Sequence, residues 1–370
     1  MNTVQSEQGT VSKPVIAMDL STAGKGGGPF TSTTRLMESE LKESYEFRTI
    51  WYDVSLGAGV SWKRILHLRD QIREIKPDIV HYTGLQLSGF HMAVACRLAG
   101  VKRTVVSVRG FSGDALYFSK IKSFLLTYIL EPFTLLSATR AVGVSKYVAN
   151  RKALRILKSK TRSFIYNFPP PVSQSISRDD IRKELKIPAD QVVAISVARI
   201  TKDKGYHIFK DSIRSLSKQT NLTILIVGRG EYLDEMQEEL SDQIAKGQVV
   251  FLGYKANVGD YLNASDIFVL PTLHETLSVA LLEASSYHLA LVASNTGGVP
   301  EIVIDGHNGR LVEPGNASEL SEAIAELVAS VEKRKEFGHN AFNRVNTTFD
   351  RRRLESQWDE LYKTILKEKR

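Results

Sequence analysis

The chain has 370 residues, a length that favours two domains. Its composition, with 42% hydrophobic and 24% charged residues, excludes intrinsic disorder, collagen-like repeats and coiled coil as descriptions of the whole chain. One cysteine, Cys96, excludes an intrachain disulfide and a cysteine-based metal cluster, and is typical of a reducing compartment. The net charge of +8 is unevenly divided, because residues 1–178 hold 25 basic and 12 acidic residues whereas residues 179–370 hold 24 and 29. The basic first half either meets an anionic partner or presents a solvated surface.

Short apolar runs alternate with longer amphipathic segments along the chain. The runs predict buried strands at residues 15–18, 79–82, 104–108, 141–144, 192–197, 222–227, 249–252, 267–270 and 291–293. The amphipathic segments include predicted helices at residues 62–75, 208–217, 232–244 and 317–331. Because this alternation is typical of parallel sheets with helices on both faces and occurs twice, we expect an α/β protein with two Rossmann-like, doubly wound domains that face a central cleft.

A proline-rich stretch, residues 167–177, separates the two patterns, and its three consecutive prolines cannot continue a helix or a central strand. We therefore expect a first domain over residues 1–172 and a second over residues 173–350. Residues 351–370 have the pattern of one polar amphipathic helix.

The sequence shows neither a signal peptide nor an apolar run of about 18 residues that could span a membrane. Residues 124–136 come nearest, and Glu131 and Pro132 interrupt them. We expect a cytoplasmic protein, with peripheral binding to the inner face of the plasma membrane as the alternative to a fully soluble one.

A glycine-rich loop, residues 21–29, follows the first predicted strand and precedes a helical pattern. Gly27 and Gly28 would let a ligand approach the backbone, and the helix end offers free N–H groups to a phosphate or a sugar hydroxyl. The loop is neither a Walker A motif nor a clean dinucleotide fingerprint, so a plain tight turn explains it equally well.

Two cations follow the first strand of the second domain. A turn there can bring Arg199 and Lys204 to one point, where they would neutralise a diphosphate and stabilise the charge that grows as it leaves. Taken alone, the pair is more simply read as two surface cations near a turn.

Two glutamates follow the strand at residues 267–270. Glu275 is expected near the start of a helix and Glu283 eight residues further on, which is a rise of about 12 Å if all eight are helical. That rise exceeds the roughly 5–9.5 Å that separates the two catalytic carboxyl groups of glycosidases, so a hydrolase pair is not expected. It suits two carboxylates that bind the two ends of an extended ligand. The N–H groups of three residues next to Glu275 could contact a sugar: Thr276, Leu277 and Ser278.

Taken in order, these motifs and the stretch Asn-Thr-Gly-Gly-Val-Pro-Glu at residues 295–301 resemble the retaining GT-B glycosyltransferases of family 4. The resemblance covers almost the whole chain. It implies a hexosyltransferase with a nucleotide-diphosphate sugar, UDP- or GDP-linked, held mostly by the second domain and a saccharide acceptor held by the first. It also implies that Arg199 and Lys204 bind the diphosphate, Glu283 the ribose and Glu275 the transferred sugar, and that the last helix crosses back to the first domain.

The sequence departs from the family pattern beside the strand at residues 104–108, where Arg109 stands in place of the usual histidine. An arginine cannot act as a base at neutral pH, but Arg109 could bind a phosphate or an acidic acceptor. His81 is a candidate substitute on the acceptor side, although a lone histidine at a strand end is more often structural. The stretch Thr276–Ser278 replaces the usual glycines, so the sugar preference can differ.

The sequence contains no Asp-x-Asp motif, and no cluster of histidines and carboxylates has metal-ligand spacing. We therefore expect no metal and no cofactor besides the donor substrate.

The basic segments 119–130 and 151–162 suit an anionic bilayer surface. Such a surface would fit a lipid-linked acceptor, for instance a polyprenyl-linked one, in surface polysaccharide or glycolipid synthesis. An ordinary sheet-covering helix explains residues 119–130 as well.

The alternatives to a glycosyltransferase are a non-catalytic binding or scaffold protein and a phosphorylase on the same fold. Nucleic acid is not an expected partner, since no recognised nucleic-acid-binding motif accompanies the basic charge.

Overall fold

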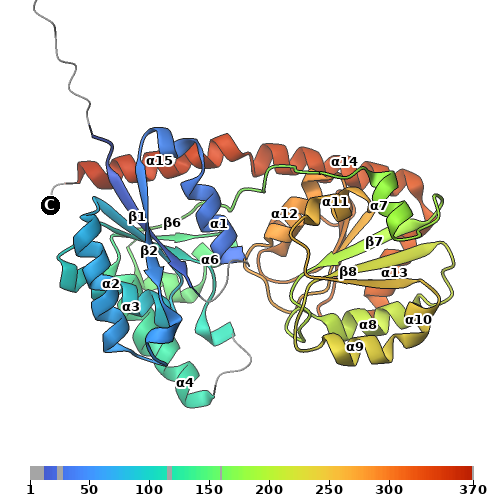
Figure 1. Cartoon of the computed structure of the whole chain (residues 1–370), viewed down its shortest axis with the longest axis horizontal. Helices are drawn as coiled ribbons and strands as arrows, with labels where there is room; N and C mark the ends of the chain where they lie inside the picture. The colour runs from blue at the N-terminus through green and yellow to red at the C-terminus, as the bar shows by residue number, and fades with distance from the viewer. Residues whose placement is uncertain (1–11, 23–27, 115–118, 159–160, 369–370) are drawn as a thin grey trace, which may run out of the picture.

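A computed structural model describes residues 12–22, 28–114, 119–158 and 161–368 of the chain. Figure 1 shows two domains side by side, each built on one parallel sheet, with two long C-terminal helices lying across both. The predicted pair of Rossmann-like domains is confirmed.

The first sheet has the strand order β2-β1-β3-β4-β5-β6, and all its neighbours are parallel. Its strands are β1 (Val15–Ser21), β2 (Glu46–Tyr52), β3 (Ile79–Thr83), β4 (Thr104–Val108), β5 (Arg140–Gly143) and β6 (Arg162–Phe164). The α-helices of this half are α1 (Gly28–Met37), α2 (Trp62–Ile75), α3 (Leu87–Ala99), α4 (Lys120–Leu125), α5 (Glu131–Ser137) and α6 (Lys146–Ala149). A 3-10 turn, η3 (Ser112–Asp114), and a π-helical turn, η4 (Leu126–Leu130), flank α4.

The second sheet has the order β12-β11-β10-β7-β8-β9. Its strands are β7 (Val192–Val197), β8 (Leu222–Val227), β9 (Val249–Gly253), β10 (Ile267–Leu270), β11 (Ala290–Ser294) and β12 (Gly309–Val312). Its helices are α7 (Arg178–Glu184), α8 (Tyr206–Ser215), α9 (Leu233–Glu239), α10 (Ser241–Ala245), α11 (Val258–Asn263), α12 (Val279–Ser286), α13 (Ala317–Ala329) and α14 (Val331–Thr348). In both sheets the direction of winding reverses next to the first strand, and ligands of open parallel sheets bind at such switch points.

Each predicted strand is present, but the sequence pattern missed three strands at or near sheet edges. β2 reads Glu-Phe-Arg-Thr-Ile-Trp-Tyr and is only partly buried, while β6 and β12 have three and four residues. Strands that are half exposed or this short lack the continuous apolar run that marks a buried parallel strand. The helix predicted at residues 232–244 is also divided, since α9 and α10 meet at Leu240.

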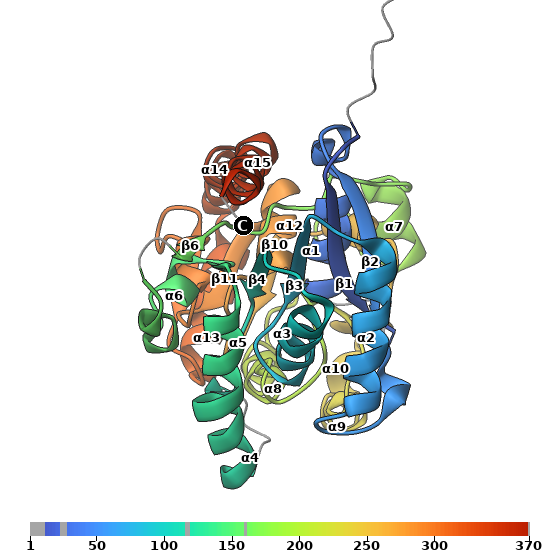
Figure 2. The same ribbon diagram turned by 90° about the vertical axis from the view of Figure 1, so that its left-hand side faces the viewer.

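The last helix, α15 (Arg351–Lys367), lies against the first domain, as Figures 1 and 2 show. Its buried Tyr362 hydroxyl contacts Nδ1 of His81 at 2.7 Å, and the Trp358 ring lies 4.8 Å from the His81 ring. The Tyr45 hydroxyl donates to the Asp359 carboxylate at 2.8 Å. These contacts fasten the C-terminal end of the chain to β3 and to the loop before β2.

The segment between β6 and α7 contains the predicted domain boundary and is held against the second domain. The Tyr287 hydroxyl contacts the backbone of Ser173, and the Asp260 carboxylate accepts the N–H groups of Ser175 and Ile176. The two domains are therefore joined by a bound segment and by the helix pair α14–α15. Within the described ranges, no helix has the length and apolar character needed to cross a bilayer.

Candidate active site

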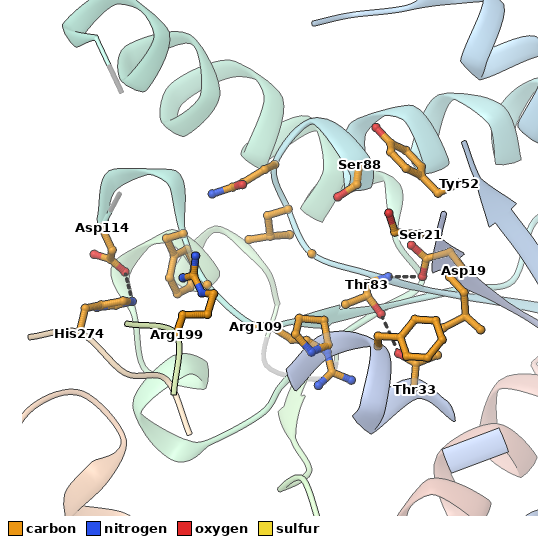
Figure 3. A pocket seen from close by; sticks show the side chains of 18 of the residues that line it. Asp19, Ser21, Thr33, Tyr52, Thr83, Ser88, Arg109, Asp114, Arg199 and His274 are labelled. Atoms are coloured by element: carbon orange, nitrogen blue, oxygen red, sulfur yellow. Dashed lines mark hydrogen bonds and ion pairs between the residues drawn. The ribbon is translucent and has the colours of Figure 1, made fainter. Parts of the chain in front are cut away.

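A cavity of about 750 Å³ lies between the two domains, at the carboxyl ends of strands from both sheets. Figure 3 shows side chains from both halves of the chain around it. The first domain contributes residues at the ends of β1, β2 and β3, residues of α1, and residues that follow β3 and β4. The second domain contributes the loop after β7, Glu231 after β8 and His274 after β10. The principal polar side chains are Asp19, Ser21, Thr33, Tyr52, Thr83, Ser88, Arg109, Asp114, Arg199, Asp203, Glu231 and His274.

The loop after β7 carries the predicted pair of cations. Arg199 lines the cavity and is largely exposed, and its Nη2 lies 3.5 Å from Oδ2 of Asp203. Lys204 is mostly buried, and its Nζ contacts Oε2 of Glu275 at 3.0 Å. Gly205 has φ +73°, and a Cβ there would lie 1.7 Å from the carbonyl oxygen of Pro271. Glycine therefore lets the β7 loop pack against the β10 loop, which brings Lys204 to Glu275.

Glu275 lies near the start of a helix, as expected, but in the loop before it. The helix α12 begins at Val279, and its N-cap is Ser278, whose hydroxyl accepts the N–H of Leu281. Glu275 belongs to the preceding loop, and its Oε1 accepts the N–H of Thr276 at 3.1 Å. Only the second half of the Glu275–Glu283 interval is helical, so the estimated rise between the glutamates does not apply.

Two glycines hold the loop that carries Glu275. The N–H of Gly298 donates to the Glu275 carbonyl at 3.0 Å. A Cβ at Gly297, which has φ +58°, would lie 1.8 Å from that same carbonyl oxygen, and one at Gly298 would lie 2.0 Å from the Thr276 carbonyl. The residues at 297 and 298 must be glycines for the loop to adopt this position.

Thr276 connects the two domains. Its hydroxyl donates to the backbone carbonyl of Arg109 at 2.9 Å, and its own carbonyl accepts the Ser145 hydroxyl at 2.7 Å. Glu301 makes a second connection, because it accepts the N–H groups of Lys146 and Tyr147 at the start of α6. These contacts place the Glu275 loop directly beside the first domain.

Glu283 lies on α12 and faces α1 of the first domain. Burial raises the pKa of its carboxyl group, and the positive charge of Arg35 partly opposes this effect. Burial likewise lowers the pKa of Arg35, whose Nη1 is buried without a hydrogen-bond partner. The carboxylate of Glu283 and the guanidinium of Arg35 are therefore both desolvated and interact electrostatically between the two domains.

Arg109 follows β4 and enters the cavity, as Figure 3 shows. Its Nη1 donates to the Asn167 side chain at 3.1 Å, whereas its Nε is buried without a partner. Burial lowers its pKa to about 10, with the charge of Asp19 acting in the opposite direction. Asp19, which sequence reasoning missed, lies in the buried part of β1 and accepts the N–H of Thr83 at 2.8 Å. Polar residues near the ends of β1 and β3 were the signal that could have identified it.

The structure does not bring His81 into the site. Both of its ring nitrogens are used in the protein interior, by the Tyr362 hydroxyl and by the Ser107 hydroxyl at 2.7 Å. Burial lowers its pKa to about 3, so the ring is neutral at physiological pH. His81 therefore fastens α15 to the sheet and is not an acceptor-side residue.

Of the glycine loop, Gly27 lies outside the described residues, and Gly28 begins α1. Three residues of α1 line the cavity, Pro29, Phe30 and Thr33.

Sequence reasoning also missed a contact between the two domains at the cavity. Nε2 of His274 lies 3.8 Å from the carboxylate of Asp114, as Figure 3 shows. Among the residues that the structure describes, no group of three or more histidine, cysteine or acidic side chains is placed to hold a metal ion.

Comparison with known proteins agrees with this arrangement. Residues 177–344 match the family described as glycosyl transferases group 1. The capsular polysaccharide biosynthesis glycosyltransferase CapM of Staphylococcus aureus is 24% identical over 337 residues, which cover 86% of this chain and 87% of CapM. The Escherichia coli UDP-Gal:α-D-GlcNAc-diphosphoundecaprenol α-1,3-galactosyltransferase is 26% identical over 321 residues, with 84% and 80% of the two chains covered.

Among solved structures, Anabaena Alr3699/HepE in complex with UDP and glucose is similar in fold, with a TM-score of 0.79 and 18% identity. The likeness covers 95% of this chain and all of that one. The two facing parallel-sheet domains described above are thus the GT-B fold.

Proposed function

Because this chain belongs to the group 1 glycosyltransferases of GT-B fold, we propose that it transfers a hexose, with retained anomeric configuration, from a UDP- or GDP-sugar to a saccharide acceptor. The observation that carries the proposal is the contact between Lys204 and Glu275, which joins the loops after β7 and β10. Other residues of these two loops, Arg199 and His274, line the cavity between the domains. There the β7 and β10 loops offer cations for a diphosphate and a carboxylate for sugar hydroxyls. The relatives named for capsular and lipid-linked saccharide synthesis support a role in polysaccharide or glycolipid biosynthesis.

We propose that residues of the cleft assist the departure of the nucleoside diphosphate from the sugar. As the bond between the anomeric carbon and the phosphate oxygen breaks, negative charge grows on the diphosphate, and Arg199 and Lys204 would neutralise it. The acceptor hydroxyl attacks from the same face, and its proton passes to the departing phosphate oxygen. Glu275 would then exchange its contact with Lys204 for contacts with the hydroxyls of the transferred sugar. Glu283, on α12, would hold the ribose.

The donor claim is tested by thermal shift with UDP-, GDP- and ADP-sugars, each measured with and without EDTA. A donor at a hundredfold excess over its Kd should stabilise the protein by about 2.7 kcal/mol. We expect a shift with the UDP- or GDP-sugars that EDTA does not change, because protein cations take the place of a divalent metal ion. No shift with any of the three would contradict the donor site, and a shift abolished by EDTA would contradict the metal-independent mechanism.

The proposed acceptor is lipid-linked, and an exposed apolar patch on α4 and η4 supports this. The patch consists of Ile121, Phe124, Leu125, Tyr128 and Ile129, which are 76%, 57%, 46%, 67% and 51% exposed. Figures 1 and 2 show α4 projecting from the body of the first domain. Exposed apolar side chains together with Lys120 and Lys122 are typical of a segment that lies in an anionic membrane interface. Since η3, which packs on η4, carries the cavity residue Asp114, a bilayer under this patch would lie near the acceptor side.

Binding of the patch to a bilayer is tested by flotation with phosphatidylcholine vesicles that contain or lack phosphatidylglycerol. We expect the protein to float with the anionic vesicles at low salt, and the double variant Ile121→Asp/Phe124→Asp to remain in the soluble fraction. Trp62→Asp is the matched control, because Trp62 is 64% exposed and lies outside the patch. The membrane proposal fails if the wild-type protein does not float, or if the double variant floats as well as the control.

A further inference from the structure

We propose that Asp19 and Arg109 form an acceptor subsite that binds one hydroxyl group of a neutral sugar: the carboxylate of Asp19 accepts a hydrogen bond from this hydroxyl, and the guanidinium of Arg109 donates one to its oxygen. This inference rests on the proposed function, and it assigns the acceptor side of the cavity to these two residues. It also makes Asp19 a specificity residue, since a carboxylate at this place disfavours an acceptor that carries a negative charge there.

The fold places Asp19 where a ligand of the first domain is expected. The winding of the first sheet reverses between β1 and β3, and this crevice is where open parallel sheets bind ligands. Asp19 lies on β1 and accepts the backbone N–H of Thr83 at the end of β3, so its carboxylate spans the crevice. Both Asp19 and Arg109 line the cavity that also contains Arg199 of the donor side (Figure 3).

The two charged groups face one cavity without pairing directly. In the described part of the chain, no ion pair within 4.0 Å joins Asp19 to Arg109, although each group feels the charge of the other. A buried carboxylate and a buried guanidinium with a purely structural role would be expected to form a bidentate ion pair with each other. Here the guanidinium turns one Nη to Asn167, and its buried Nε has no partner. A ligand group that both donates and accepts, such as a hydroxyl, satisfies both residues at once.

The surroundings of Asp19 make its charge state sensitive to pH. Burial raises its pKa to about 7, against the opposing effects of the Thr83 N–H and the Arg109 charge. The titratable groups that face it are Arg109 after β4, Tyr52 on β2, Tyr82 on β3 and Cys96 on α3. Burial raises the pKa values of both tyrosines and of the cysteine, so these groups remain neutral where Asp19 titrates. Among these groups, Asp19 is thus the one whose ionisation changes near neutral pH.

The test compares Asp19→Asn with wild type and with Asp53→Asn, which removes a carboxylate from an exposed turn after β2 that does not line the cavity. The acceptors are octyl glucoside, galactoside and N-acetylglucosaminide, together with octyl glucuronide as the anionic probe. We expect wild type to use a neutral glycoside in preference to the glucuronide. Asp19→Asn should raise the KM for that neutral acceptor by about tenfold.

Three further readouts separate this role from a structural one. The wild-type KM for the acceptor should rise as the pH falls below about 7, and this dependence should be absent in Asp19→Asn. The thermal shift given by the nucleotide sugar should be unchanged, and the melting temperature of Asp19→Asn at pH 8 should equal or exceed that of wild type, because the variant no longer buries an ionised carboxylate. A structural carboxylate would instead lower it.

The subsite is excluded if the acceptor KM and its pH dependence are the same in Asp19→Asn and wild type, or if the glucuronide is used as well as the neutral glycosides. Failure of the proposed function looks different, because then no nucleotide sugar shifts the melting temperature of the wild-type protein.

Discussion

Replacing Lys204 by alanine is expected to lower the rate of sugar transfer by about 100-fold or more, with little change in the folded structure. Lys204 is mostly buried and is held 3.0 Å from Glu275, so its charge acts in a place that water screens weakly. The leaving diphosphate gains charge only as the glycosidic bond breaks, and a cation there stabilises the transition state more than the bound donor. The loss should therefore appear mainly in kcat, measured with saturating donor.

The matched control for Lys204 is Lys202→Ala in the same loop. Lys202 is 58% exposed, and its Nζ lies 3.7 Å from the Glu235 carboxylate, which is a surface contact of little energetic value. The control should keep nearly full activity, and the melting temperatures of both variants show whether the loop remains folded. Near-normal turnover by Lys204→Ala would contradict the role assigned to this lysine.

Gly297→Ala is expected to lower transfer by about 100-fold by moving the loop that carries Glu275. The added Cβ would lie 1.8 Å from the Glu275 carbonyl oxygen, far inside any real contact, so the loop or the 295–298 turn must shift. A displacement of about 1 Å at a catalytic constellation can cost about 100-fold in rate. The measurement is kcat/KM for the donor, alongside circular dichroism to verify that the variant is folded.

Gly306→Ala provides the control, because Gly306 has φ +69° and a Cβ added there would meet no atom within 4 Å. It shares the strain of a left-handed alanine, which is about 1–2 kcal/mol, but lacks the collision with Glu275. Equal losses of activity in Gly297→Ala and Gly306→Ala would mean that backbone strain in the second domain, and not the position of Glu275, controls turnover.

The sequence was sufficient to predict the two parallel-sheet domains, since their central strands are continuous apolar runs such as β7 and β8. It was insufficient for β2, whose exposed residues interrupt the apolar run, and for the loop that separates Glu275 from the first turn of α12. The loop after β10 is held by Gly297 and Gly298 from a distant segment, and no local pattern around Glu275 reveals that contact.

Of the two cations that follow β7, Arg199 lines the cavity, whereas Lys204 pairs with Glu275 of the loop after β10. That both bind a diphosphate stays a prediction. Asp19 was missed because its only signal in the sequence is one acidic residue near the end of an apolar strand. Its proposed role follows from Thr83 and Arg109, which are far away in sequence. His81 was considered for the opposite reason: a histidine at a strand end is visible in the sequence, whereas its burial against Tyr362 of the last helix is not.

The most direct measurement is the crystal structure of the protein soaked with the nucleotide sugar that gives the largest thermal shift. We predict the diphosphate against Arg199 and Lys204, the sugar at Glu275, and the ribose hydroxyls at Glu283. A donor bound with its diphosphate away from both cations, or outside the cleft between the two sheets, would contradict the proposed donor site.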